Sequence, residues 1–236
     1  MATYVLIHGA GSDSWYWHRV VPLLRARGHE VVTPDLPCED EEAGLAEYTD
    51  VVVDAIGGRT DPVLVAQSMA GFTAPLVCTR VPVELMVLVA AMVPAPGESP
   101  ADWWANTGQP AARRELDERE GRDPDAEFDP LVTFFHDLPA DMLAEMTARP
   151  VLNQAGAPFL KPWPLQSWPQ VPTRFLLCRQ DRLFPADFQR RVVRERLGFT
   201  PDEMDGGHLP ALARPRELVE RLEAYRISRP EARPIR

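Results

Sequence analysis

A short apolar run that meets a serine at a sharp bend constrains this chain more than any other feature. Val63 to Ala66 is uncharged and apolar, which is typical of a strand buried on both faces of a parallel sheet. Ser68 follows almost at once, and the apolar segment from Phe72 to Val81 predicts a helix. The chain must therefore turn from strand to helix at Ser68, which places the hydroxyl in front of the N-terminus of that helix.

Such a bend needs small residues two positions before and two positions after the serine, because larger side chains would collide with the neighbouring strand and helix. Ala66 and Ala70 fill these places, where glycine is usual, and Gly71 follows. A pattern of five residues is common by chance. The alternative interpretation is that Ser68 only caps a helix after a strand.

Strand and helix patterns alternate through most of the chain. Further strands are predicted at Thr3 to His8, His29 to Asp35, Glu84 to Ala91, Thr173 to Cys178 and Pro201 to Asp205. Helices are predicted at Trp15 to Arg27, with Pro22 separating a short first turn, and at Ala43 to Ile56, Pro185 to Leu197 and Pro215 to Arg226, with a frayed tail from Ser228. This alternation indicates the α/β class, with a mostly parallel, doubly wound sheet of about six strands.

Residues 94 to 168 differ from the rest, because prolines crowd this segment and no strand alternation is visible. Helical patterns occur at Ala111 to Gly121 and Asp141 to Arg149. We interpret the segment as a mainly helical cap inserted into a core domain of residues 1–93 and 169–236. Candidate pocket residues are Trp103, Trp104, Phe135, His136, Trp163 and Leu209. Alternatively, the tryptophans only hold the insertion together, and His136 forms a hydrogen bond that holds the cap.

Composition narrows the partners. The formal net charge of −10 argues against nucleic acid or an anionic membrane and favours a hydrophobic small molecule as substrate. The three cysteines have no metal-ligand spacing, which favours reduced thiols. The first residues lack a basic region, and no apolar segment is long enough to span a membrane. We expect a cytoplasmic monomer or homodimer.

Two further motifs supply an acid and a base for the serine. Asp181 follows the strand at Thr173 to Cys178 by three residues, and His208 lies in a Gly-Gly-His-Leu-Pro loop after the next strand. Because the carboxyl ends of parallel strands lie at one edge of a sheet, we expect Ser68, Asp181 and His208 to converge there. A serine hydroxyl becomes a nucleophile when a base takes its proton and a third group orients that base.

The order serine, aspartate, histidine is associated with the α/β-hydrolase fold, and the chain resembles that superfamily. Within it, the chain is similar to the small esterase, plant methylesterase and hydroxynitrile lyase group. The resemblance rests on H-G-A-G-S-D-S-W-Y-W, A-Q-S-M-A-G-F, R-Q-D, F-Q-R-R and G-G-H-L, and in the cap on F-F-H-D-L-P. It implies an oxyanion hole formed by the backbone N–H groups of Ala10 and Met69. Gln67 stands where this group often has histidine.

We predict hydrolysis of a carboxylic ester, or a related acyl compound, through an acyl-Ser68 intermediate. Neither a cofactor nor a metal is expected, because the chain has no phosphate-binding glycine motif and no ligand cluster. The alternatives are a hydroxynitrile lyase, a cofactor-free perhydrolase, suggested by Ser68-Met69, and a receptor that does not turn over its ligand. The lyases of the resembling group have threonine and lysine where this chain has Gly9 and Leu209, which favours hydrolysis.

Overall fold

A single sheet forms the centre of the computed structural model, which describes residues 1–228. The six strands found in this range are β1 (Thr3–Ile7), β2 (Glu30–Val32), β3 (Val63–Gln67), β4 (Leu85–Val89), β5 (Thr173–Cys178) and β6 (Asp202–Met204). Their order is β2-β1-β3-β4-β5-β6, and every neighbouring pair is parallel. This confirms the predicted parallel α/β sheet. The predicted strand at His29 to Asp35 is shorter, since Pro34 has no N–H to donate to a neighbour.

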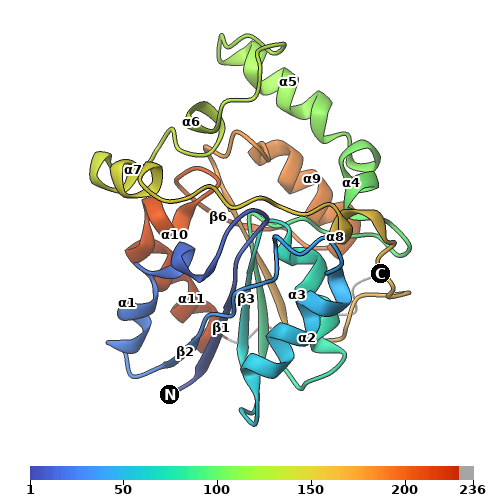
Figure 1. The fold of residues 1–236 in the computed structure, drawn as a ribbon, viewed down its shortest axis with the longest axis vertical. Coiled ribbons are helices and arrows are strands. Elements are labelled where there is room, and N and C mark those ends of the chain that lie inside the picture. Colours follow the sequence, from blue (N-terminus) through green and yellow to red (C-terminus); the bar gives the residue numbers. More distant parts are fainter. Residues whose placement is uncertain (229–236) are drawn as a thin grey trace.

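Helices cover both faces of the sheet, as a doubly wound fold requires (Figure 1). The helices α2 (Leu45–Ile56), α3 (Ala70–Cys78) and α9 (Ala186–Leu197) contribute to one buried apolar cluster, and α1 (Val21–Arg25) and α11 (Pro215–Ser228) contribute to the other. Successive strand residues alternate between the clusters: Leu64 belongs to the first and Val65 to the second. The strands are therefore buried on both sides, as their continuous apolar sequences predict.

The first predicted helix is interrupted, as the proline in it suggested. A 3₁₀ turn, η1 (Ser14–Trp17), precedes α1, and Asp13 accepts a hydrogen bond from the Trp15 N–H at the start of that turn. Pro22 lies in the first turn of α1, where its missing N–H costs nothing. The short α10 (Pro210–Ala213) follows the Gly-Gly-His loop. The predicted frayed tail lies outside the described residues except for Ser228, which ends α11.

Five helices lie between β4 and β5, over the carboxyl ends of the strands (Figure 1). They are α4 (Pro100–Thr107), α5 (Gln109–Arg119), α6 (Pro130–Thr133), α7 (Ala140–Thr147) and α8 (Ala157–Leu160). The two helical patterns of the sequence correspond to α5 and α7. The other three went unrecognised: α6 and α8 have only four residues each, too few to show a helical period, and α4 begins at Pro100 in a proline-rich stretch.

Three tryptophans of residues 94–168 donate hydrogen bonds to backbone carbonyls, two of which lie outside this segment. The indole Nε1–H of Trp103 donates to the Val93 carbonyl at 3.0 Å, that of Trp163 to the Phe72 carbonyl at 3.0 Å, and that of Trp168 to the Pro94 carbonyl at 3.1 Å. All three rings are buried. The division of the chain into a core domain and a cap stays a prediction. Among the described helices, none has the length and apolar character needed to cross a lipid bilayer.

Candidate active site

Ser68 occupies the bend between β3 and α3. Its backbone φ is 54°, a left-handed conformation that residues other than glycine rarely adopt. Such a conformation costs about 1–3 kcal/mol and persists only where the surroundings impose it. Here the Ser68 N–H donates to the Val89 carbonyl at 3.3 Å. The Ser68 carbonyl accepts from the N–H groups of Gly71 at 3.1 Å and Met92 at 2.9 Å. The end of β4 and the segment after it therefore hold the bend.

Gly71 is the position in this bend that needs glycine. A Cβ built there would lie 1.9 Å from the Met92 carbonyl oxygen, far inside van der Waals contact. The usual glycine positions hold Ala66 and Ala70, which are both buried in the core beneath the bend. The extra glycine of the motif thus allows α3 to start directly against the backbone that follows β4.

Ser68, His208 and Asp181 form one hydrogen-bonded line. His208 Nε2 lies 3.0 Å from Ser68 Oγ, and His208 Nδ1 lies 2.8 Å from Asp181 Oδ2. Since an ionised carboxylate can only accept, Nδ1 carries the ring proton and Nε2 is free to accept one from the serine. The structure therefore brings together the three side chains that the sequence placed at the ends of β3, β5 and β6.

Asp181 is held by its own loop. Its Oδ1 accepts from the N–H groups of Leu183 at 2.8 Å and Phe184 at 2.9 Å, while Gln189 Nε2 lies 3.4 Å from Oδ2. Asp181 is only 1% exposed and His208 only 2%, so water competes little for these bonds. A buried carboxylate with this many donors keeps its orientation toward the imidazole.

Two phenylalanines border the imidazole of His208. The ring centroid of Phe184 lies 5.0 Å away in an edge-on arrangement, and that of Phe134 lies 5.5 Å away. The sequence pointed to Phe135, the neighbour of Phe134, because two adjacent aromatic residues give no sign of which one faces the site. Phe135 packs on Phe134, with 6.4 Å between the ring centroids.

The loop that carries His208 is held from both sides. Gln67 Nε2 donates to the His208 carbonyl at 3.0 Å, and the Gly207 N–H donates to Asp137 Oδ2 at 2.6 Å. The sequence noted Gln67 only as a departure from the resembling group and gave Asp137 no role. The single available signal was the position of Gln67 beside the serine, because both bonds join residues far apart in the chain.

The loop after β1 runs against the serine bend. A Cβ at Gly9 would lie 2.5 Å from Gln67 Oε1 and 2.9 Å from the Ser68 Cβ, so only glycine lets the two segments approach this closely. The next residue, Ala10, and Met69 on the other side of the bend donate no backbone hydrogen bond to any residue in the range 1–228. Two backbone donors beside Ser68 therefore remain available.

His8 shapes this loop. Its Nε2 accepts from the Leu36 N–H at 3.0 Å, and its Nδ1 lies 2.8 Å from the Gly9 carbonyl. Burial lowers the pKa of His8 and keeps the imidazole neutral.

A comparison of the sequence with protein families agrees with the arrangement of Ser68, His208 and Asp181. Residues 4–221 match the family model described as the alpha/beta hydrolase family. The chain belongs to this family. The match spans β1 to α11 and therefore includes the serine bend, the acid and the base.

Relatives within the α/β-hydrolase family are similar over almost their whole length. A probable esterase of Oryza sativa is 27% identical over 248 residues, which cover 93% of this chain and 94% of the relative. Methylesterase 3 of Arabidopsis thaliana is 26% identical over 248 residues, covering 91% and 92%. The crystal structure of a pyrethroid hydrolase from Sphingobium faniae superposes with a TM-score of 0.77 at 23% identity, covering 96% of this chain and 98% of that one. That superposition establishes the fold.

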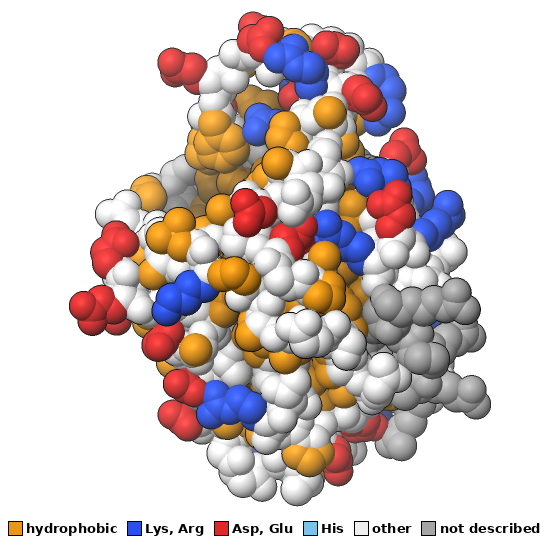
Figure 2. Space-filling view, turned by 90° about the vertical axis from the view of Figure 1, so that its right-hand side faces the viewer, with side chains coloured by type: hydrophobic (Ala, Val, Ile, Leu, Met, Phe, Trp, Pro, Cys, Tyr) orange, Lys and Arg blue, Asp and Glu red, His pale blue; other side chains and the backbone are white. Residues whose placement is uncertain are grey.

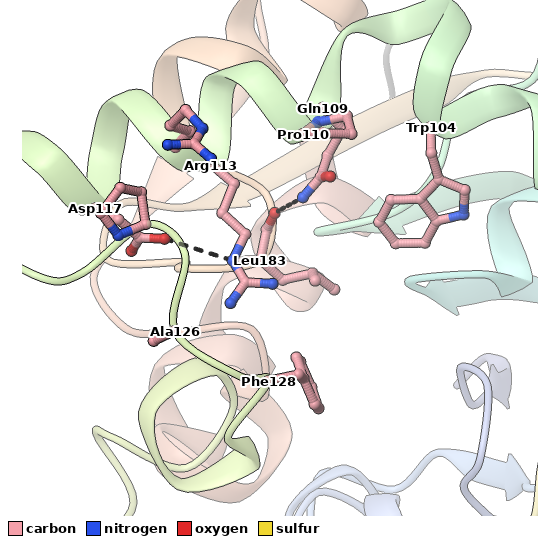
Figure 3. Close-up of a pocket in the computed structure, with 10 residues that line it drawn as sticks. Trp104, Gln109, Pro110, Arg113, Asp117, Ala126, Phe128 and Leu183 are labelled. Atoms are coloured by element: carbon pink, nitrogen blue, oxygen red, sulfur yellow. Dashed lines mark hydrogen bonds and ion pairs between the residues drawn. The ribbon is translucent and has the colours of Figure 1, made fainter.

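A cavity of about 510 Å³ lies under α5, beside the loop that follows β5 (Figure 3). It is lined by Trp104, Gln109, Pro110, Arg113, Arg114, Asp117, Pro124, Ala126, Phe128 and Leu183. In the space-filling view, hydrophobic side chains gather in a hollow below the charged side chains at the top of the molecule (Figure 2). Of the predicted pocket residues, Trp104 lines this cavity.

The other predicted pocket residues lie elsewhere. Trp103 and Trp163 are buried in the core, and backbone carbonyls occupy their indole N–H groups, which matches the alternative reading that they hold the insertion together. His136 lies against the His208 loop, where its Cε1 would be 2.8 Å from a Cβ at Gly207, and burial lowers its pKa. Phe135 and Leu209 are partly buried. A pocket role for these five residues stays a prediction.

Proposed function

We propose that this protein is a serine hydrolase that cleaves carboxylic esters of small hydrophobic molecules, with Ser68 as nucleophile. The observation that carries the proposal is the line from Ser68 Oγ to His208 at 3.0 Å and from His208 to Asp181 at 2.8 Å, located at a strained strand-to-helix bend. A serine that only capped a helix would need neither a buried imidazole nor a buried carboxylate behind it.

In the proposed reaction, His208 Nε2 takes the Ser68 proton as Oγ attacks the ester carbonyl carbon. Asp181 stabilises the imidazolium that forms. The imidazolium then gives its proton to the departing alkoxide, which leaves as the alcohol, and the acyl group remains on Ser68. Water, deprotonated by the same imidazole, attacks the acyl carbon. The bond from this carbon to Ser68 Oγ breaks, the imidazolium returns its proton to Oγ, and the acid leaves. Every proton that His208 accepts is passed on, so the cycle restores the starting state without a cofactor.

The backbone N–H groups of Ala10 and Met69 serve as the oxyanion hole in this proposal. Their support is that both are free of hydrogen bonds within residues 1–228 and flank the serine bend. Met69 precedes the first residue of α3, so the helix dipole adds to the attraction for a negative oxygen. Donors fixed before the reaction stabilise the developing charge without reorganising, and each is worth about 3–4 kcal/mol in comparable sites.

The relatives support ester hydrolysis by their names, which include a probable esterase, methylesterases, a pyrethroid hydrolase and polyneuridine aldehyde esterase. These names share the hydrolase reaction and differ in substrate. The cysteines Cys38, Cys78 and Cys178 are free thiols, which supports a cytoplasmic location. Burial raises the pKa of Cys78 to about 12, so this thiol has no role as a nucleophile.

A panel of p-nitrophenyl esters of increasing acyl length, together with aryl methyl esters, tests the proposal. Ser68→Ala is expected to lower kcat by about a million-fold, and Ser228→Ala, a serine at the end of α11, serves as the control that leaves it unchanged. Mass spectrometry detects the acyl-Ser68 adduct when deacylation is slow. Activity of Ser68→Ala within about tenfold of the wild type rules out Ser68 as the nucleophile.

Cyanohydrin cleavage is the alternative that the same panel addresses. A lyase needs a positive charge beside the catalytic histidine to hold the departing cyanide, and this chain has Leu209 there, packed against apolar residues. We therefore expect no efficient release of cyanide from mandelonitrile. Rapid release, with no turnover of any ester, would show that the lyase reaction is the true one.

A further inference from the structure

The cavity under α5 borders the active site through three of its lining residues. The Leu183 N–H donates to Asp181 Oδ1 at 2.8 Å. The ring centroids of Trp104 and Phe184 lie 5.7 Å apart, and those of Phe128 and Phe134 lie 5.6 Å apart. These two phenylalanines are the rings that pack on His208. The lining residues of the cavity therefore contact either Asp181 itself or the two rings that pack on His208.

Arg113 extends from α5 into this cavity, between Leu183 and Phe128 (Figure 3). Its Nε lies 3.6 Å from Asp117 Oδ2, which is longer than a hydrogen bond. The other oxygen of Asp117 already accepts from Arg122 Nε at 2.7 Å. No residue within the range 1–228 accepts a hydrogen bond from the Arg113 guanidinium.

The second arginine of the lining is different. Arg114 donates to Asp125 and has Glu118 at 4.0 Å, so its charge is already paired. Two arginines and one aspartate are the charged residues that line the cavity. Arg113 is thus the charged lining residue with unused N–H donors. Most of the other lining side chains are apolar: Trp104, Pro110, Pro124, Ala126, Phe128 and Leu183.

We propose that this cavity is a subsite for the acyl chain of the substrate and that Arg113 binds a carboxylate at the end of that chain. The proposal rests on the proposed ester hydrolysis and names its substrate class: monoesters of hydrophobic dicarboxylic acids. A volume of about 510 Å³ accommodates an apolar chain or a ring, which the faces of Trp104 and Phe128 cover. The two terminal nitrogens of a guanidinium match the two oxygens of a carboxylate, which selects this group over a neutral carbonyl.

Paired substrates test the assignment. Mono-p-nitrophenyl esters of dicarboxylic acids are compared with p-nitrophenyl esters of monocarboxylic acids over a series of chain lengths. At the chain length that reaches Arg113, the carboxylate is expected to lower KM by about tenfold to a hundredfold. Arg113→Gln removes this preference, whereas Arg113→Lys keeps part of it.

Arg119→Gln is the matched control, because Arg119 lies on the same helix outside the cavity lining and pairs with Asp187 at 3.8 Å. It is expected to leave the preference for the carboxylate intact. An equal loss in Arg119→Gln would assign the effect to the general field of α5 and overturn the subsite. So would the absence of a preference at every chain length.

Calorimetry measures the binding of the matching dicarboxylic acid. This measurement tests the subsite independently of ester hydrolysis. Binding that depends on Arg113, without turnover of any ester, would preserve the subsite and reject ester hydrolysis. Turnover of neutral esters, without any dependence on Arg113 in either assay, would preserve ester hydrolysis and reject the subsite.

A second inference concerns the loop that carries His208, and it rests on separate contacts. The Gly207 N–H donates to Asp137 Oδ2 at 2.6 Å, and a Cβ at Gly207 would lie 2.7 Å from Asp137 Oδ1. Asp137 lies between α6 and α7, in the segment over the strand ends. We infer that Asp137 is a positioning residue, which sets the place of His208 through the adjacent peptide group.

Kinetics of three variants test this role. Asp137→Ala is expected to lower kcat by about tenfold to a hundredfold and to change KM less than about threefold, since a small displacement of the base affects chemistry more than binding. Asp137→Asn is expected to recover most of kcat, because an amide oxygen also accepts the Gly207 N–H. Asp141→Asn, a carboxylate on α7 bonded to Arg19, serves as the control.

Thermal unfolding of each variant keeps the test decisive. If Asp137→Ala loses kcat while Asp137→Asn does not, at similar Tm, Asp137 positions the base. An unchanged kcat in Asp137→Ala, or losses of kcat that follow Tm in all variants, would overturn the role.

Discussion

Replacing Gly71 by alanine adds one methyl group at the most crowded point of the serine bend. The new Cβ would lie 1.9 Å from the Met92 carbonyl oxygen and 3.0 Å from its carbonyl carbon. Both partners are backbone atoms, and neither can rotate away. The Met92 N–H also donates to the Ser68 carbonyl at 2.9 Å, so the two segments must separate by more than about 1 Å and strain this bond.

Overpacking of this kind costs about 1–3 kcal/mol where flexible side chains can adjust, and more where backbone must move. We expect a loss of at least about 3 kcal/mol in the free energy of unfolding, even though alanine is the better helix former by about 1 kcal/mol. For a chain of this length, this corresponds to a decrease in Tm of about 6–12 °C. Because Met69 and Ser68 move with α3, kcat is expected to fall about a hundredfold in the folded fraction.

Urea denaturation and active-site titration measure the two effects separately. Gly58→Ala is the matched control, because a Cβ at Gly58 has no atom within 4 Å, and its free energy of unfolding is expected to stay within about 0.5 kcal/mol. If Gly71→Ala unfolds at the same urea concentration as Gly58→Ala and keeps its kcat, the close contact between α3 and Met92 does not exist in solution.

Three further predictions concern the acid, a carboxylate far from the site, and an indole. Asp181→Asn is expected to lower kcat by about 10⁴-fold at unchanged Tm, since an amide cannot stabilise the imidazolium; a loss below about tenfold would contradict its role. Burial opposes ionisation of Glu223, but hydrogen bonds from Arg226, Tyr4 and His29 outweigh it and lower the pKa from 4.5 to about 2. This carboxylate therefore stabilises the fold fully above about pH 4.5, and the stabilisation disappears as pH falls toward 2. In urea titrations, the advantage of about 1–2 kcal/mol that the wild type has over Glu223→Gln should shrink across that window. Trp163→Phe removes the bond to the Phe72 carbonyl and should cost about 1–3 kcal/mol without changing the ranking of ester substrates; a changed ranking would place Trp163 in the pocket.

Sequence periodicity was sufficient for the sheet and insufficient for the segment over it. Apolar runs such as Val63 to Ala66 identify buried strands, because a strand with two buried faces is mostly apolar on both. Helices α6 and α8 have only four residues each, so neither period nor length distinguished them from loops, and α4 begins at a proline in a proline-rich stretch. Which aromatic residues reach the site depended on the path of these helices, and Phe134 was missed for that reason.

The sequence by itself determined the order of the elements and the three side chains of the candidate site. Strand ends, a bend at a serine and glycine-rich loops are local features, and parallel strands bring their carboxyl ends together whatever the rest of the fold does. The tertiary structure decided the contacts that cross the chain: Gln67 with His208, Asp137 with Gly207, and Gly71 against Met92. It also decided that, of the two arginines that line the cavity, Arg114 is paired with Asp125, while Arg113 donates no hydrogen bond within residues 1–228. Such contacts change with shifts of a few tenths of an ångström between segments up to 141 residues apart in the chain. No local sequence pattern encodes them.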